Sequence, residues 1–306
     1  MTDHKKKRRF FRQRKLSEDC ASKPQECSRL QKATRTFLQN KLAVIGAVIL
    51  LGFIVCAVFA PYIAPHPPLE MDLTSLHKPP GTPGHLLGTD NLGRDVLSRL
   101  IYGSRISLSV GLVVVSIAAA IGTTMGLLSG FYGKGVDIVI MRLVEVFVAF
   151  PFLILVVAVI ALLGPSIYNV MLVLGLVSWP IYARLVRSEV LAIRELPYIE
   201  AARAIGSSNA RIMFRHILPN CISSVLVTAA MSMAGAILST AALGFLGLGV
   251  QPPTPEWGMM LNDAKQFLRR YPWEIFYPGV AIMLVVLALN FLGDGLRDAL
   301  DPRLYR

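Results

Sequence analysis

The sequence is poor in charge and in cysteine. Only 16% of its 306 residues are charged, whereas 54% are hydrophobic, and the mean hydropathy is +0.56. This balance excludes an ordinary soluble globule and is typical of a protein that crosses a membrane several times. Among the four cysteines, Cys20 and Cys27 have a spacing that matches no common zinc pattern, and the five histidines are scattered. We therefore expect no metal site.

Sequence signatures of catalysis are also missing. No G-x-x-x-x-G-K-[ST] is present, so the chain lacks a phosphate-cradling loop, and neither H-E-x-x-H nor G-x-S-x-G occurs. We expect no catalytic residue and no cofactor in this chain. If the protein uses chemical energy, another subunit must supply it.

Acidic residues are outnumbered by basic ones, nineteen to thirty-one, and the formal net charge is +12. Basic residues hold loops on the cytoplasmic side of a membrane, which explains this charge better than binding to nucleic acid does. Twenty-four of the thirty-one basic residues lie in 1–41, 131–142, 184–215 and 297–306. This distribution places both termini and the 187–219 connection in the cytoplasm.

Six apolar segments are long enough to cross a bilayer, which takes about 20 residues per helix. They predict an all-α polytopic membrane protein with six transmembrane helices, at about 42–60, 106–128, 138–163, 169–186, 221–246 and 278–292.

Two longer connections lie on the opposite side from the basic segments. Residues 61–104 predict a Pro-rich extended stretch, then a turn and an amphipathic helix lying on the membrane surface. Residues 250–278 predict a Pro-rich turn, a helix and a belt of interfacial aromatic residues. Each is either a simple connection or a surface for docking or gating.

One face of the second apolar segment consists of small residues. Ala118, Gly122, Gly126 and Gly130 recur every four residues, so they lie on one side of a helix. Such a face lets a neighbouring helix approach closely, in this chain or in a second membrane subunit.

The third and fourth apolar segments contain residues that are unusual in a membrane helix. Glu145 is a candidate pathway residue because an acid is costly inside a membrane. The alternative is a structural pair of Glu145 with Arg142, one turn away. Pro151 and Pro180 are expected to bend their helices.

A short basic segment at 195–219 interrupts the apolar runs. Pro197 suits a first helical turn, and Glu200 is favourable near the positive end of a helix. Gly206 is expected to end this helix after about two turns. The next helix, capped by Ser207 or Ser208, is expected to stop at Pro219.

This segment resembles the EAA loop of ABC importer membrane subunits. The resemblance rests on Glu200-Ala201-Ala202, Gly206 and Leu218-Pro219 at the expected offsets, although His216 replaces the usual Ile. It extends over residues 40–304. Four stretches are similar to the "C" type subunit of the dipeptide/oligopeptide/nickel branch: "LGTDNLGRDVLSRL" (87–100), "RHILPN" (215–220), "LGFLGLGVQPPTPEWGMML" (243–261) and "GDGLRDALDPRL" (293–304).

The resemblance implies a type I ABC importer-like permease fold in the cell membrane. It implies four kinds of partner: a homologous second permease subunit, two ATP-binding subunits that use ATP and Mg²⁺, an extracytoplasmic substrate-binding protein and a peptide substrate. The EAA loop would dock on an ATP-binding subunit, and Ala201 and Ala202 would let that partner approach closely. The residues expected to couple the subunits are Glu200, Ala201, Ala202, Gly206, Leu218 and Pro219.

The resemblance also suggests how the chain is divided. We expect a basic cytoplasmic tail at 1–41, the first transmembrane helix and an extracytoplasmic loop at 42–104, and a five-helix permease core at 105–297. The core contains the cytoplasmic coupling loop at 187–219, and residues 298–306 form a second cytoplasmic tail.

Other functions stay open at this point. The same role in a nickel or metal-chelate importer is the main alternative. A stand-alone channel would leave the EAA-type loop without a purpose, and no span carries a ring-forming set of charges. A membrane enzyme would need convergent nucleophilic or metal-binding residues within the spans, and none is evident.

Overall fold

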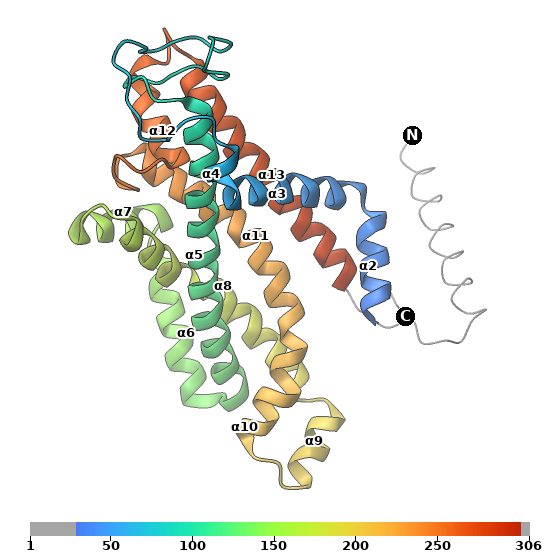
Figure 1. Ribbon diagram of the computed structural model, residues 1–306. Helices are drawn as coiled ribbons and strands as arrows, with labels where there is room; N and C mark the ends of the chain where they lie inside the picture. Colours follow the sequence, from blue (N-terminus) through green and yellow to red (C-terminus); the bar gives the residue numbers. More distant parts are fainter. Residues whose placement is uncertain (1–28, 301–306) are drawn as a thin grey trace, which may run out of the picture.

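The described part of this protein is mainly helical (Figure 1). The computed structural model describes residues 29–300, and within them extended backbone pairs only at two isolated bridges. The elements in chain order are α2 (Arg29–Gln39), α3 (Lys41–Val58), α4 (Ala60–Ile63), α5 (Val96–Tyr132), α6 (Lys134–Ala149), α7 (Phe152–Leu163), α8 (Ile167–Ile193), α9 (Pro197–Ala204), α10 (Asn209–Arg211), the π-helix η1 (Ile212–Ile217), α11 (Leu218–Phe245), α12 (Trp257–Ala264), the 3₁₀-helix η2 (Lys265–Phe267) and α13 (Trp273–Leu300). Most of the two predicted tails, residues 1–28 and 301–306, lies outside the described residues.

Five helices are long and apolar enough to cross a membrane. They are α3, α5, α8, the continuous helix Asn209–Phe245, and α13. The pair α6 and α7 passes the same test together, although the two helices are bent by 87°. The prediction of an all-α membrane protein is confirmed, and all six predicted segments are helical.

The third predicted span, 138–163, is wrong as a single helix. It breaks between Ala149 and Phe152, where Pro151 follows Phe150. The residue before a proline is forced into extended backbone, and Phe150 has φ −91° and ψ 139°. The proline was expected to bend the helix, and its effect is a complete break.

The second predicted span is longer than expected. No separate surface helix precedes it, because α5 runs without interruption from Val96 to Tyr132. Asp95 caps its first turn by accepting a hydrogen bond from the backbone N–H of Ser98 (2.8 Å), and no helix breaker follows. The predicted division at 104/105 therefore falls inside a helix, whose first turns pack against the 256–264 segment.

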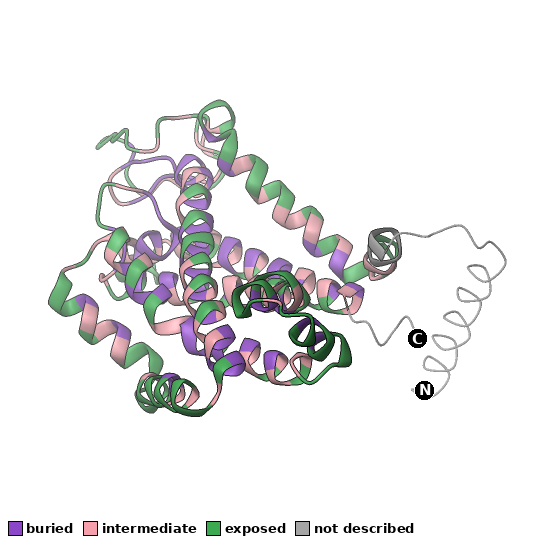
Figure 2. Cartoon of the chain, turned by 90° about the horizontal axis from the view of Figure 1, so that it is seen from below, coloured by how far each residue is buried: buried purple, intermediate pink, exposed green. Residues whose placement is uncertain are grey.

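The core of the bundle lies along α5, α8 and α11, and the contact between α5 and α8 is the most extensive. Figure 2 shows the buried residues gathered where the helices meet, and α12 and α13 contribute to them as well. In contrast, α2 and α3 extend away from α5, α8 and α11 in Figure 1, and α3 packs mainly against α13. Its other face keeps large apolar side chains such as Val48 and Leu51 exposed, as expected where lipid or another membrane subunit covers a helix.

Candidate functional site

The connection between α8 and α11 projects from one end of the bundle, at the bottom of Figure 1. Its short helix α9 begins with Leu196 at the N-cap and Pro197 in the first turn, as predicted. The helix has eight residues, close to the expected two turns. Its position is fixed by Arg194, which donates a hydrogen bond from Nη1 to the Gly130 carbonyl of α5 (2.9 Å).

Gly206 ends α9 in the way that its residue type predicts. Its φ is +78°, a conformation that favours glycine. The Gly206 N–H donates to the Arg203 carbonyl (2.9 Å), and the Ser207 N–H donates to the Ala202 carbonyl (3.0 Å), which together form a Schellman motif. No heavy atom lies within 4 Å of the position that a Cβ at Gly206 would take. The backbone conformation, and not crowding, therefore limits substitution at this position.

The two alanines of the EAA-type motif face different environments. Ala201 is exposed, whereas Ala202 is only 7% exposed and packs in a cluster with Ile199, Ile212 and Met213 of its own chain. The expectation that a partner approaches Ala202 closely is therefore wrong. A small residue is needed there because the return of the chain into α11 lies directly against α9.

The surface of the connection that remains open is apolar at its tip. Ile205 is 83% exposed, and Tyr198 and Phe214 are also exposed. Glu200 lies in the first turn of α9 and is exposed as well. The tip thus presents large apolar side chains at the end of a rigid, hydrogen-bonded turn.

The helix that follows does not stop at Pro219, contrary to expectation. Ser208 caps it, and helical backbone continues from Asn209 through η1 into α11, with Leu218 and Pro219 in the first turn of α11. A proline ring collides with the carbonyl four residues earlier in a regular α-helix. The wider π-turn before Pro219 removes this collision, so the proline sits within a continuous span.

The small face of α5 packs against α8 of the same chain. A Cβ at Gly126 would lie 2.5 Å from the Ala183 carbonyl oxygen, and a Cβ at Gly130 would lie 2.7 Å from the Val190 Cβ. A Cβ at Gly122 would lie even closer to the Trp179 carbonyl oxygen of α8, and Ala118 is buried. This close seam joins the connection at one end to the middle of the bundle.

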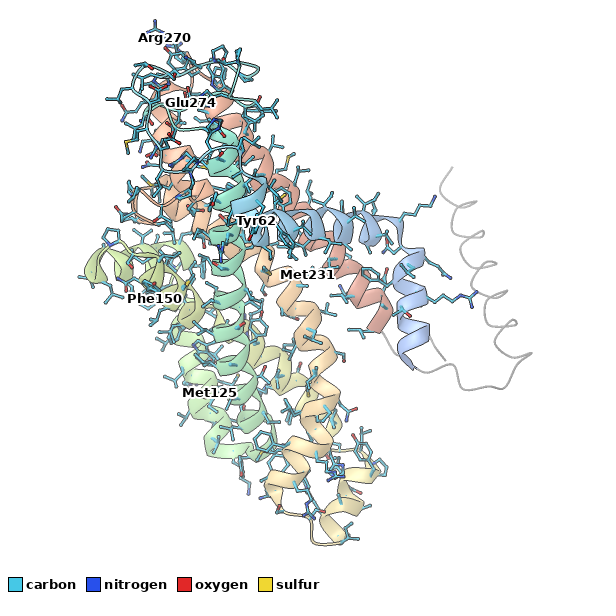
Figure 3. The ribbon with its side chains drawn as sticks, in the orientation of Figure 1. Tyr62, Met125, Phe150, Met231, Arg270 and Glu274 are labelled. Atoms are coloured by element: carbon cyan, nitrogen blue, oxygen red, sulfur yellow. The ribbon has the colours of Figure 1, made fainter. Side chains whose placement is uncertain are left out.

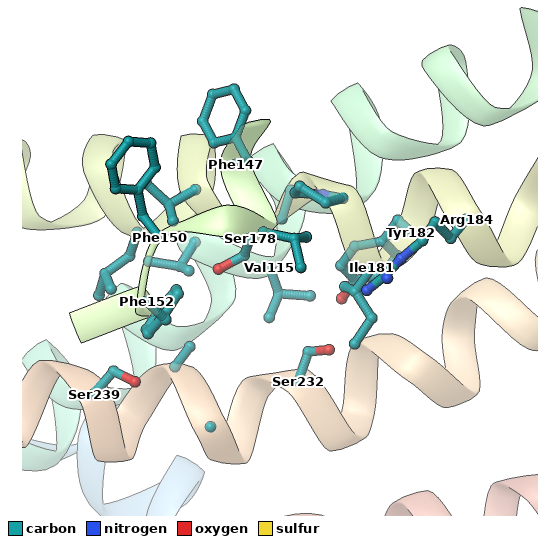
Figure 4. Close-up of a pocket in the computed structure, with 18 residues that line it drawn as sticks. Val115, Phe147, Phe150, Phe152, Ser178, Ile181, Tyr182, Arg184, Ser232 and Ser239 are labelled. Atoms are coloured by element: carbon teal, nitrogen blue, oxygen red, sulfur yellow. The ribbon is translucent and has the colours of Figure 1, made fainter. Parts of the chain in front are cut away.

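A cavity of about 460 Å³ lies in the middle of the bundle, between α5, α8, α11 and the α6–α7 break (Figure 4). Its wall is mainly apolar, with hydroxyl groups of Ser178, Tyr182, Ser232 and Ser239 and the guanidinium group of Arg184. Three aromatic side chains, Phe147, Phe150 and Phe152, line the part next to the break. Apolar walls with a few polar groups are typical of sites for small organic molecules.

Glu145 lies on α6, away from this cavity. Its carboxylate accepts a hydrogen bond from Arg142 (2.7 Å), and both side chains are largely exposed. They line a second hollow of about 670 Å³ together with Asp137, Arg184 and Arg187. The structural alternative, an Arg142–Glu145 pair, is therefore formed in the structure, and a role in transport stays a prediction.

The opposite end of the bundle is closed by residues that the sequence analysis did not single out. Arg94 and Arg99 are buried and pair with Asp90 and Asp263. Burial raises the pKa of the Asp263 carboxyl, against the opposing effect of the two arginines. Figure 3 shows this end, where Glu274 and Arg270 are labelled. Charged residues in a predicted loop gave no signal that they would be buried.

Glu256 anchors the helix at this end. It caps α12, accepting hydrogen bonds from the backbone N–H groups of Gly258 and Met259 (2.9 Å each) and from the Ser107 hydroxyl (3.2 Å). Burial raises the pKa of its carboxyl above the ordinary value. The predicted helix in 250–278 is thus present and is tied to α5.

Two families of known proteins match the sequence. The family described as "Binding-protein-dependent transport system inner membrane component" matches residues 122–306, and "N-terminal TM domain of oligopeptide transport permease C" matches residues 28–80. The dipeptide transport system permease protein DppC of Escherichia coli K12 is 47% identical over 288 residues, covering 92% of this chain and 96% of the relative. This chain belongs to the ABC importer permeases of the dipeptide/oligopeptide branch.

Other relatives of this permease carry related names. DppC of Alkalihalophilus pseudofirmus is 46% identical over 90% of both chains, and the glutathione transport system permease protein GsiD of Pectobacterium atrosepticum is 45% identical over 88% of this chain and 90% of the relative. The fold is similar to a chain of the MetNI methionine ABC transporter in inward-facing conformations, with a TM-score of 0.54, 21% identity, and coverage of 66% of this chain and 97% of that chain.

The family match helps to place the site in the permease. The longer match contains the connection with α9, the glycines at 122, 126 and 130, and all of the cavity lining except Val114, Val115 and Ala118. The shorter match contains α2, α3 and α4. The cavity residues were missed by sequence reasoning because they come from four separate segments and share no motif.

Proposed function

We propose that this permease is one of the two membrane-spanning subunits of an ATP-driven importer of di- and oligopeptides. The observation that carries this proposal is the 47% identity over nearly the whole chain to a dipeptide permease. Relatives named for glutathione support the same substrate class, because glutathione is a tripeptide. The central cavity, apolar with hydroxyl groups and Arg184, suits a small peptide whose side chains vary and whose carboxylate is constant.

The remaining parts of the machine belong to other chains. The second permease subunit would complete the translocation pathway, two ATP-binding subunits would hydrolyse ATP with Mg²⁺, and an extracytoplasmic protein would deliver the substrate. The permease itself would carry no catalytic residue. The exposed tip around Ile205 would dock on an ATP-binding subunit, and the seam between α5 and α8 would transmit the movement to the cavity.

The orientation that we propose places the tip of the connection and both termini in the cytoplasm, following the twenty-four to seven distribution of basic residues. Cys20 and Cys27 in the N-terminal tail should react with an impermeant thiol reagent only after sealed, right-side-out vesicles are opened. A matched pair sharpens this test after Cys20, Cys27, Cys56 and Cys221 are changed to Ser: Leu86→Cys, exposed at the other end, should react from outside, and Ile205→Cys should not. Labelling of Ile205→Cys from outside would refute this orientation.

The substrate is tested by reconstituting the complete complex in vesicles. With ATP inside and the loaded binding protein outside, we expect uptake of a labelled dipeptide, competition by longer peptides and no uptake without ATP. Preferential uptake of Ni²⁺ or its chelates would support the alternative substrate. Substrate flux through the permease reconstituted alone would instead indicate a channel.

A further inference from the structure

We propose that this chain binds a divalent transition-metal ion of the Zn²⁺ type through His66, His85 and Asp95. The three residues lie at the end of the molecule opposite the α8–α11 connection. One possible ligand atom from each residue lies within 4.8 Å of the other two. Imidazole nitrogens and a carboxylate oxygen are ligands that zinc prefers, and three protein ligands with a water molecule complete a tetrahedral site.

Asp95 presents its second carboxylate oxygen, Oδ1, to the two histidines and shares a hydrogen bond with His85 through it. Its Oδ2 is used by the cap of α5, accepting from the Ser98 N–H (2.8 Å) and the Ser98 hydroxyl (2.7 Å). Its Oδ1 lies 3.0 Å from Nδ1 of His85 and 4.0 Å from Nδ1 of His66. The carboxylate is therefore already oriented, in the way that hydrogen bonds from neighbouring groups orient the residues that bind a metal.

The charge of this carboxylate lacks a permanent positive partner. The Asp95 side chain is 1% exposed, and across residues 29–300 its ion-pair partners within 4.0 Å are these two histidines. The neighbouring arginines, Arg94 and Arg99, pair instead with Asp90 and Asp263. A buried carboxylate is costly without a cation, and a bound metal ion would neutralise it.

His66 has a ring nitrogen that the protein leaves unused. Its Nδ1 is buried and has no hydrogen-bond partner, although the side chain as a whole is 34% exposed. A buried polar atom without a partner is costly, and coordination would satisfy it. The His66 and His85 rings lie close, with centroids 4.9 Å apart and planes tilted by 32°.

The distances are compatible with closure around an ion. Zinc bound tetrahedrally at 2.0–2.1 Å separates its ligand atoms by about 3.3 Å. The Asp95–His85 separation of 3.0 Å is near this value, and the Asp95–His66 separation of 4.0 Å would have to shorten by less than 1 Å. The two histidine ligand atoms lie within 4.8 Å of each other and would have to approach by up to about 1.5 Å. His66 is the most exposed of the three side chains, at 34%, so an ion would enter past its ring.

The ion would link two points of the long 64–95 connection to the N-terminus of α5. His66 follows α4 directly, His85 lies within the connection, and Asp95 caps α5. The His66 N–H already donates to the Ser98 hydroxyl (3.0 Å), so the ion would reinforce an existing contact. No sequence motif indicates this site, because its ligands are spread from residue 66 to residue 95.

The test measures zinc in the assembled transporter, purified without a histidine tag, stripped with a chelator and dialysed against Zn²⁺. We expect one more zinc per permease chain in the wild type than in His66→Ala or His85→Ala, measured by elemental analysis. His77→Gln is the matched control, because His77 lies at the same end but hydrogen bonds to Glu274, and it should keep the zinc.

Two further variants separate metal binding from the helix cap. Asp95→Asn keeps an oxygen that can cap α5 but removes the charge, and it should lose the zinc while the complex still assembles. Ser98→Ala removes the hydroxyl that donates to Asp95 and accepts from the His66 N–H, and it should weaken zinc binding by about 10–100-fold in competition with a chromophoric chelator.

Wild-type protein alone can overturn the proposal, even if variants fail to fold. Co²⁺ added to the stripped wild-type complex should produce the visible absorption of a tetrahedral site, and the His66→Ala complex should lack it. Equal zinc content in wild type and an assembled His66→Ala complex, or no Co²⁺ absorption in the wild type, would show that the three residues form only a hydrogen-bonded cap.

Discussion

At the α12 end of the molecule, Arg99 is 2% exposed and shares Asp90 and Asp263 with Arg94, all within one chain. At the α9 end, Ile205 is 83% exposed and no charge network covers it in the described structure. The α12 end buries a network of paired charges, although Leu73 and Leu86 are exposed there, whereas the α9 end exposes Ile205 at a turn that, within residues 29–300, no such network holds. Figures 1 and 3 show these two ends at opposite extremes of the bundle.

The difference lies in what holds each end together. Exposed large apolar side chains on an ordered turn are typical of a surface that another protein covers. The buried ion pairs, in contrast, hold the 72–99 segment and the 256–274 segment together without a partner. Substitutions at each end separately test this difference.

The largest effect is expected at the closed end. Arg99→Met leaves buried acidic groups without one of their two basic partners, which should destabilise the protein by about 3–5 kcal/mol. Arg105→Met on the same helix is the matched control, because Arg105 is exposed, and it should change stability by less than about 0.5 kcal/mol. Thermal unfolding of the purified complex in detergent measures both. Equal unfolding temperatures for the two variants would mean that the buried charges do not hold this end together.

A smaller effect should separate the two alanines at the open end. Ala202→Leu overpacks the cluster beneath α9 and should cost about 1–3 kcal/mol, seen as a lower unfolding temperature of the permease even without ATP-binding subunits. Ala201→Leu adds its side chain to an exposed position, so it should leave that temperature unchanged and weaken only association with the ATP-binding subunit. A reversed pattern would contradict the assignment of the buried and exposed faces of α9.

A pH-dependent effect is expected from Glu256 at the closed end. Burial raises the pKa of its carboxyl in the folded protein, so the protonated form is favoured by folding. The stability from this group is fully present below its unfolded pKa and is lost as the pH rises through the folded value. Relative to Glu256→Gln, the wild type should therefore gain thermal stability as the pH is lowered from 8 to 5. A constant difference between the two proteins across this range would disprove the shift.

The smallest effect is expected for Glu200→Ala. It removes a negative charge from the first turn of α9, where the helix dipole favours it by roughly 0.3–1 kcal/mol. Glu200→Asp keeps the charge and should behave like the wild type. Coupled ATPase activity should fall only slightly in the alanine variant. A complete loss would assign Glu200 a direct contact with a partner.

Features that depend on one residue type or one period could be predicted from the sequence. The spans follow from apolar length, and the close-packing face of α5 follows from small residues every four positions, although its partner α8 does not. The end of α9 follows from Gly206, whose φ of +78° few other residues adopt. The break at Pro151 was predicted only as a bend, since local sequence does not reveal how far the surrounding helices allow the chain to turn.

Features that depend on which segment packs against which face of a helix could not be predicted from the sequence. Ala201 and Ala202 are the same residue type in an eight-residue helix, and only the return of η1 against α9 decides which one is buried. From the sequence, Arg94 and Arg99 are expected to be exposed. They are buried because Asp263, which is far away in the sequence, lies beside them in the fold. The cavity is likewise assembled from four segments that no local pattern connects.

The variant Ile205→Glu in the reconstituted transporter, compared with Ile205→Val, tests most directly whether the ATP-binding subunit acts at the open end of the molecule. Because Ile205 is exposed, neither change should alter the unfolding temperature of the permease. We predict that Ile205→Glu abolishes both peptide uptake and the stimulation of ATPase activity by loaded binding protein, while Ile205→Val retains them. Wild-type uptake and wild-type stimulation in the Ile205→Glu complex would show that the open end of the molecule is not where the ATP-binding subunit acts.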